Sequence, residues 1–171
     1  MTFLSRLSYR TRQFKLAFLG PWTPIPDEAL TPHLSPPLQA LFRRMTPSEQ
    51  AHSFAVLQRL QAGGYSDPDL LTSALLHDVG KTLSPLSTID RVLVVLAKRF
   101  LPRLAQRWGA GKPGRFTRRF ITAACHPAWG ANLALEAGAS PRTCNLIRRH
   151  QDFTSSDDSM LLALQSADDF E

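Results

Sequence analysis

The stretch Ala74-Leu75-Leu76-His77-Asp78-Val79-Gly80-Lys81 places an imidazole and a carboxylate side by side at the end of an apolar run. Leu70 and Leu71 extend that run, which predicts a helix that is apolar on most sides and therefore central in the fold. Burying the ionised Asp78 there is costly unless a cation or a full set of hydrogen bonds compensates its charge. The stretch therefore predicts a polar centre, and a metal ion would supply the positive charge.

Four of the chain's five histidines and one late aspartate follow one another in the order His52, His77-Asp78, His126, His150 and Asp168. Only His33, in a proline-rich segment, lies outside this order. The order, with His-Asp-Val-Gly-Lys as its most specific part, resembles the signature of the HD-domain superfamily of metal-dependent phosphohydrolases. The resemblance covers residues 46–171 and implies a compact, all-α helical bundle with a metal site between its central helices.

The resemblance also implies how the ligands divide between ions. The first ion would take His52, His77, Asp78 and Asp168, and the second would take Asp78, His126 and His150. Imidazole and carboxylate donors together suit divalent Mn, Fe, Ni, Co or Zn, whereas Mg²⁺ is less suited as the number of histidines rises. Six candidates are too many for one ion with an open substrate position, and two ions sharing Asp78 would use them naturally. The sequence leaves open whether one ion or two bind, and whether Asp168 or Asp169 is the last ligand.

The activity implied by the resemblance is hydrolysis of a small phosphorylated substrate, with a phosphate ester or anhydride of a nucleotide as the expected class. Asp78 and Lys81 would be catalytic, and Lys81, Arg148 and Arg149 would bind the substrate. Two alternatives remain. One is an oxygenase with a di-iron centre, and the other is a catalytically silent module that binds a polyanion, a membrane or a protein partner. The Gly-Tyr-Pro motif of cyclic-di-GMP phosphodiesterases is absent, which argues against that subfamily.

Local signals predict the helices that carry the first ligands. Thr46-Pro47-Ser48-Glu49 is typical of a helix start with a capping box, and this helix should run to Gln61 and stop at Gly63-Gly64. His52 lies near the edge of its apolar stripe and, taken alone, would more often be a hydrogen-bonded core or boundary residue. Asp67-Pro68 begins the next helix, whose last turn should hold His77 and Asp78 about 100° apart. We expect Gly80 to terminate that helix and to leave Lys81 free to point into the same pocket.

The second half of the chain also reads as helical. A helix over residues 115–125 should end where His126-Pro127 bends the chain, because proline disfavours helical geometry at the preceding residue. Residues 128–137 should resume as a helix, Ser140-Pro141 should begin another that ends near His150, and residues 155–158 should precede the last helix. No convincing strand pattern appears, so the predicted fold class is all-α.

The remaining segments divide into an N-terminal part and an insertion. Residues 1–45 are basic and proline-rich, with a short amphipathic helix predicted over the first sixteen residues and irregular chain after it. We expect this part to pack on the domain of residues 46–171 or to be tethered to it. Residues 84–119 form a basic insertion, in which residues 109–114 are predicted to be a flexible connector, because a phosphate loop would need a preceding strand.

The insertion contains a Leu- and Val-rich helix, predicted over residues 92–101 and kinked or stopped at Pro102. Its composition is typical of a helix that binds a partner or a membrane surface, although we favour packing within its own domain. From Arg91 to Leu135 there is no Asp or Glu, within a chain of net charge +6. Such a positive field favours contact with an anionic surface.

The cysteine pattern and the hydropathy of the chain predict its cellular compartment. Cys125 and Cys144 form neither a CxxC pair nor a disulfide framework, so a reducing cytoplasm is the expected setting. No apolar run approaches the ~20 residues of a spanning helix, which predicts a soluble protein without a transmembrane segment. A monomer and a homodimer both remain open.

Overall fold

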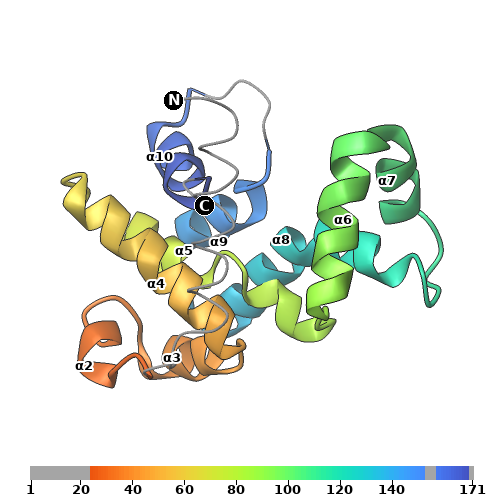
Figure 1. Cartoon of the computed structure of the whole chain (residues 1–171). Helices are drawn as coiled ribbons and strands as arrows, with labels where there is room; N and C mark the ends of the chain where they lie inside the picture. The colour runs from red at the N-terminus through yellow and green to blue at the C-terminus, as the bar shows by residue number, and fades with distance from the viewer. Residues whose placement is uncertain (1–23, 153–156, 170–171) are drawn as a thin grey trace.

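The computed structural model describes residues 24–152 and 157–169. Within these residues the chain forms helices and no strands, which confirms the predicted all-α class (Figure 1). The helices are α2 (Asp27–Leu30), α3 (Pro36–Arg43), α4 (Pro47–Ala62), α5 (Pro68–Leu76), the 3₁₀ helix η1 (Val79–Leu83), α6 (Thr88–Phe100), α7 (Pro102–Gly109), α8 (Arg118–Glu136), α9 (Pro141–Arg149) and α10 (Ser159–Asp168).

Capping residues determine where helix α4 begins and ends. The side chain of Thr46 accepts a hydrogen bond from the Glu49 amide, and Glu49 accepts one from the Thr46 amide, so the predicted capping box is confirmed. Gly63 is the C-cap residue, and Gly64 follows with a φ of 83°, which glycine adopts without strain. These end signals fix the length of α4 and therefore the place of His52 on it.

The main hydrophobic core includes residues from both sides of the predicted boundary at residues 45 and 46. Leu30 and Phe42 are completely buried in the same cluster as Leu57, Leu75 and Leu164. The prediction of irregular chain is wrong for residues 36–43, where α3 forms. Pro36 and Pro37 lie in its first turn, where no helical hydrogen bond from their nitrogens is needed. The amphipathic helix predicted over the first sixteen residues lies outside the described residues.

Helix α8 is continuous, so the predicted break at His126-Pro127 is wrong. Pro127 removes one intrahelical hydrogen bond, yet the helix continues to Glu136. Buried residues on both sides of the proline pack α8 against η1 and α9, and this packing outweighs the local preference. Thr122, His126 and Gly130 follow one another at helical spacing and are all buried. His126 therefore points inward because of its helical register.

The end of α5 also differs from the prediction. The helix ends at Leu76, so His77 and Asp78 lie at its junction with η1 instead of in its last turn. Gly80 does not terminate α5; among the described glycines only Gly64 and Gly138 have a positive φ. Gly80 is required by a close approach, because a Cβ atom there would lie 2.0 Å from the carbonyl oxygen of His126. The crossing of Gly80 over α8 brings Asp78 next to His126.

Helices α6 and α7 stand to one side of the other helices (Figure 1). They share with α8 a small second core made of Val94, Ala105 and Phe120. Helix α6 begins earlier than predicted, at Thr88, where Ser87 and Asp90 form a capping box. Val94 is its one buried residue, so the expectation that its apolar face packs within the domain is wrong for most of that face. Residues 110–117 connect α7 to α8, so the connector lies where it was predicted but ends three residues later, because α8 begins at Arg118.

The described helices include none with both the length and the hydropathy of a bilayer-spanning segment.

Candidate metal centre

Six predicted ligands from distant parts of the chain meet at one place. They come from the first turns of α4, the α5–η1 junction, the middle of α8 and the ends of α9 and α10, and they are His52, His77, Asp78, His126, His150 and Asp168. They form two groups that could each hold a metal ion. These groups coincide with the two ligand sets that the resemblance implied, apart from the shared position of Asp78.

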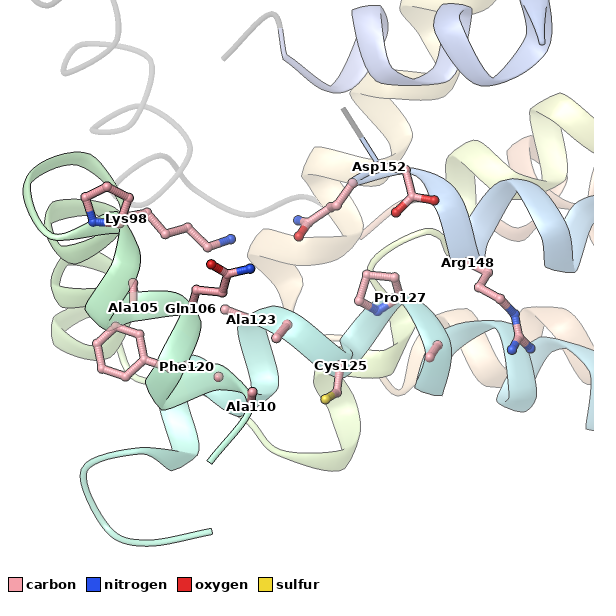
Figure 2. Close-up of a pocket in the computed structure, with 15 residues that line it drawn as sticks. Lys98, Ala105, Gln106, Ala110, Phe120, Ala123, Cys125, Pro127, Arg148 and Asp152 are labelled. Carbon is pink, nitrogen blue, oxygen red and sulfur yellow. The ribbon is translucent and has the colours of Figure 1, made fainter. Parts of the chain in front are cut away.

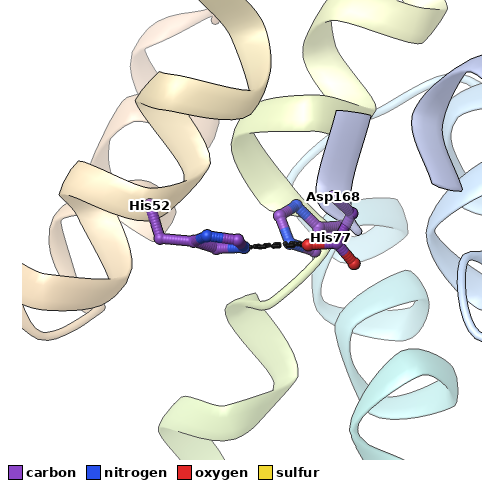
Figure 3. A group of neighbouring side chains, drawn as sticks. All are labelled: His52, His77 and Asp168. Carbon is purple, nitrogen blue, oxygen red and sulfur yellow. Dashed lines mark hydrogen bonds and ion pairs between the residues drawn. The ribbon is translucent and has the colours of Figure 1, made fainter. Parts of the chain in front are cut away.

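The first group consists of His52, His77 and Asp168 (Figure 3). The Nε2 atom of His52 lies 3.2 Å from Nε2 of His77 and 2.9 Å from Oδ1 of Asp168, and the latter oxygen lies 3.5 Å from Nε2 of His77. Two donors about 2.1 Å from a common ion are about 3.0 Å apart at right angles and about 3.4 Å apart at the tetrahedral angle. The three atoms therefore have the spacing of ligands on one face of an ion.

The second group consists of Asp78, His126 and His150, all of them buried. Oδ1 of Asp78 lies 3.3 Å from Nε2 of His126 and 4.0 Å from Nε2 of His150. The other carboxylate oxygen, Oδ2, lies 3.7 Å from Nε2 of His77 in the first group. Asp78 thus places one oxygen near each group, so its carboxylate would be able to ligate an ion in either group.

Backbone hydrogen bonds fix the tautomers of three histidines. The Nδ1 atoms face backbone carbonyls at 2.7–3.0 Å, in the pairs His77 with Ala74, His126 with Thr122, and His150 with Ile147. A carbonyl can only accept, so Nδ1 carries the proton and each neutral ring has its lone pair on Nε2. Within the described part of the chain, Nε2 of His126 and of His150 is buried and has no hydrogen-bond donor. A divalent ion would satisfy both lone pairs, so the residues fit a metal.

The carboxylates of the centre are held in their ionised form. Burial opposes ionisation of Asp78, but the positive charges of Lys81 and His77 outweigh it and hold the pKa of Asp78 well below its usual range. Burial likewise opposes ionisation of Asp168, and His77 and His52 outweigh it, so the pKa of Asp168 is also lowered. A buried and a half-buried anion among imidazole nitrogens make a strongly cation-attracting site.

The surroundings shift the pKa values of His77 and His150 in opposite directions. Burial lowers the pKa of His150 to about 3, and the nearby His77 adds to the effect. Burial also acts to lower the pKa of His77, but the charges of Asp78 and Asp168 outweigh it, so that pKa is raised. His150 is therefore neutral at physiological pH, as a metal ligand must be.

The three cationic residues predicted to bind substrate, Lys81, Arg148 and Arg149, each have a different partner. Lys81 does not point freely into a pocket, since its Nζ atom pairs with Oδ2 of Asp78 at 2.5 Å. Arg148 donates a hydrogen bond to the side chain of Asn132 at 3.0 Å. The guanidinium of Arg149 lies 3.8 Å from the carboxylate of Asp158, at the start of α10. Lys81 is thus in direct contact with a member of the centre.

A cleft of about 710 Å³ opens on the α7 side of α8, and its described lining includes none of the six ligands (Figure 2). Its walls come from α7, α8 and the chain that follows α9, and Pro127 and Gln151 in these walls directly follow the ligands His126 and His150. The side chain of Lys98 extends into the cleft in Figure 2, and Arg148 contributes to its rim. Desolvation lowers the pKa of Lys98, and the charge of Lys81 lowers it further. Sequence reasoning missed Lys98, because its position in the amphipathic helix carries no signal for a pocket.

Comparisons with protein-family models, with curated proteins and with solved structures gave no match to this chain. The six-residue geometry therefore carries the functional argument.

Acid should destabilise the metal-free protein through His150. Its pKa is 6.5 when unperturbed and about 3 in the fold, so between these pH values the unfolded state binds more protons. The free energy of unfolding should therefore fall from pH 6.5 toward pH 3, by up to about 1.4 kcal/mol per pH unit from this residue.

Urea titrations in chelator at about pH 6.5 and about pH 4.5 should show a smaller pH dependence for His150→Gln than for the wild type. His33→Gln is the matched control, because His33 is only partly buried. Equal pH dependence in the wild type and in His150→Gln would contradict the assignment.

Proposed function

We propose that this protein is a phosphohydrolase that uses two divalent metal ions, and that it is related to the HD-domain superfamily that its motif resembles. The observation that carries the proposal is the division of six buried or half-buried ligands into two groups with Asp78 between them. Mixed imidazole and carboxylate donors favour Mn, Fe, Ni, Co or Zn over Mg²⁺.

The chain's own residues would prepare the reaction. When bound, the ions would supply Lewis acidity and lower the pKa of a coordinated water. The carbonyls that accept from Nδ1 hold the imidazoles in a fixed orientation, so little reorganisation is needed on binding. Lys81, held beside Asp78, would place a positive charge next to the phosphoryl oxygens.

The cleft along α7 and α8 supports a nucleotide as the substrate class. Phe120, Ala123 and Pro127 give it an apolar wall that suits a flat base, and Lys98 and Arg148 supply cations for phosphate oxygens. The cleft's volume lies in the range of small-molecule sites. Arg148 would thus contribute at the cleft, whereas Arg149 faces α10.

The test is metal analysis of protein purified without added metal, followed by a phosphate-release panel of nucleoside mono-, di- and triphosphates with each candidate ion. We expect about two ions per chain and metal-dependent release from at least one nucleotide. Lys98→Gln should raise KM more than it lowers kcat, and Lys112→Gln, on the exposed connector, is the matched control.

Metal-loaded protein that releases no phosphate from the panel would contradict the proposal. Iron-dependent oxygen uptake under those conditions would point to the oxygenase alternative instead.

A further inference from the structure

The apolar stripe of α6 faces solvent. Its members recur at i, i+3, i+4, i+7 and i+11, a spacing that normally marks the buried side of a helix, and they are Ile89, Val92, Leu93, Leu96 and Phe100. Ile89 and Phe100 are 73% and 72% exposed. The adjacent side of α6, with Val94 and Ala97, already packs in the small second core. Among the described residues, the fold therefore leaves this stripe exposed.

The stripe continues into the next helix. Leu101 and Leu104, at the start of α7, are 49% and 40% exposed. Helices α6 and α7 pack against each other and stand apart from the main core in Figure 1. We call these seven residues of the two helices the α6–α7 apolar surface. An exposed apolar patch of this extent marks an interaction site more often than chance.

The charged residues from Arg91 onward in α6 and α7 are all basic. Arg91 to Leu135 contains no acidic residue, and the exposed cations of the same helices and of the connector after them are Lys98, Arg99, Arg103, Arg107, Lys112 and Arg115. Asp90, just before this segment, is already paired with Arg119 at 2.9 Å. The partner must therefore offer apolar contact and negative charge together.

We infer that the α6–α7 apolar surface docks on an anionic lipid membrane. A helix that carries aliphatic and aromatic residues on one side and Arg and Lys beside them lies in the plane of the interface, with its apolar side among the acyl chains. The 13 residues of α6 make a rod about 20 Å long, enough for such a contact. Each cation near an anionic leaflet adds to the attraction. The contact is peripheral, and it does not depend on the proposed phosphohydrolase activity.

Two other occupants fit less well. A second copy of the chain would bring like cations together, with no acidic residue in either copy's segment to balance them. Nucleic acid would accept the cations but would leave the apolar stripe in water, because phosphate contacts supply most of such binding. An acidic leaflet satisfies both features.

The test is co-sedimentation of the full chain with vesicles of phosphatidylcholine alone or mixed with phosphatidylglycerol. We expect binding to the mixed vesicles, weakened by salt, and much weaker binding to the neutral ones. The Leu96→Glu, Phe100→Glu double variant should lose at least ~10-fold in binding to mixed vesicles. Leu135→Glu, an equally exposed leucine on α8, is the matched control and should bind like the wild type.

The double variant should keep its far-UV circular dichroism and its metal content, which separates a surface effect from unfolding. Unchanged vesicle binding in that variant would overturn the inference, because the contact would then lie elsewhere in the chain. Absence of vesicle binding would also overturn it, as would a dimer that the double variant dissociates in analytical ultracentrifugation.

Discussion

Replacing Asp78 by asparagine is expected to remove both metal ions and the proposed activity together. The substitution keeps the shape of the side chain, but the charge that faces both ligand groups disappears. Changing an outer partner of a metal ligand typically costs 10–100-fold in affinity or activity, so losing a bridging ligand should cost at least ~100-fold. Metal content and phosphate release, measured on the same preparations, check this expectation.

The control for this variant is Asp27→Asn, the same chemical change at a carboxylate that is 72% exposed and pairs with Arg43. Single substitutions of His52 and His150 by asparagine refine the result, since each removes a ligand of one group only. We expect each to lose mainly one of the two ions. Wild-type metal content in Asp78→Asn would refute the bridging role.

Replacing Gly80 by alanine is expected to destabilise the protein strongly. Its Cβ would lie 2.0 Å from the carbonyl oxygen of His126 and 2.6 Å from the amide nitrogen of Gly130, and backbone atoms cannot rotate away as a side chain can. Helix η1 would have to move off α8, at a cost of about 3 kcal/mol or more. Urea titration with metal removed measures this loss directly.

Gly114→Ala is the matched control, because the nearest atom to its added Cβ is the Thr117 hydroxyl oxygen at 3.3 Å. We expect that variant to stay within about 0.5 kcal/mol of the wild type. The Gly80 variant should also bind metal more weakly, since η1 carries Lys81 and follows Asp78. Wild-type stability in Gly80→Ala would show that η1 and α8 are not in such close contact.

Features with local causes were predictable from the sequence. The capping box of Thr46 and Glu49 and the glycines after α4 act within one helical turn, and the structure has them where the sequence placed them. The ligand types followed from their chemistry and order. That these ligands lie together in space could be inferred only from the resemblance to HD-domain proteins, because it depends on the packing of helices that are far apart in the chain.

Features with tertiary causes were missed. Glycine at position 80 suggested a helix end, whereas its role is to let η1 approach α8. Pro127 suggested a break, but packing on both sides keeps α8 continuous. Periodicity revealed the apolar stripe of α6 without revealing which side of the helix the protein covers. Each of these depends on a neighbour that the local sequence does not contain.

The contact between His52 and Asp168 joins residues that are 116 positions apart in the chain. An ion held between them would act as a removable cross-link that closes most of the polypeptide into one loop. Closing so long a loop restricts the unfolded chain by several kcal/mol in the chain-entropy picture used for disulfides. Asp168 lies in the final turn of α10, so the ion would fasten the C-terminal helix to α4, and the free energy of unfolding would rise with the metal concentration.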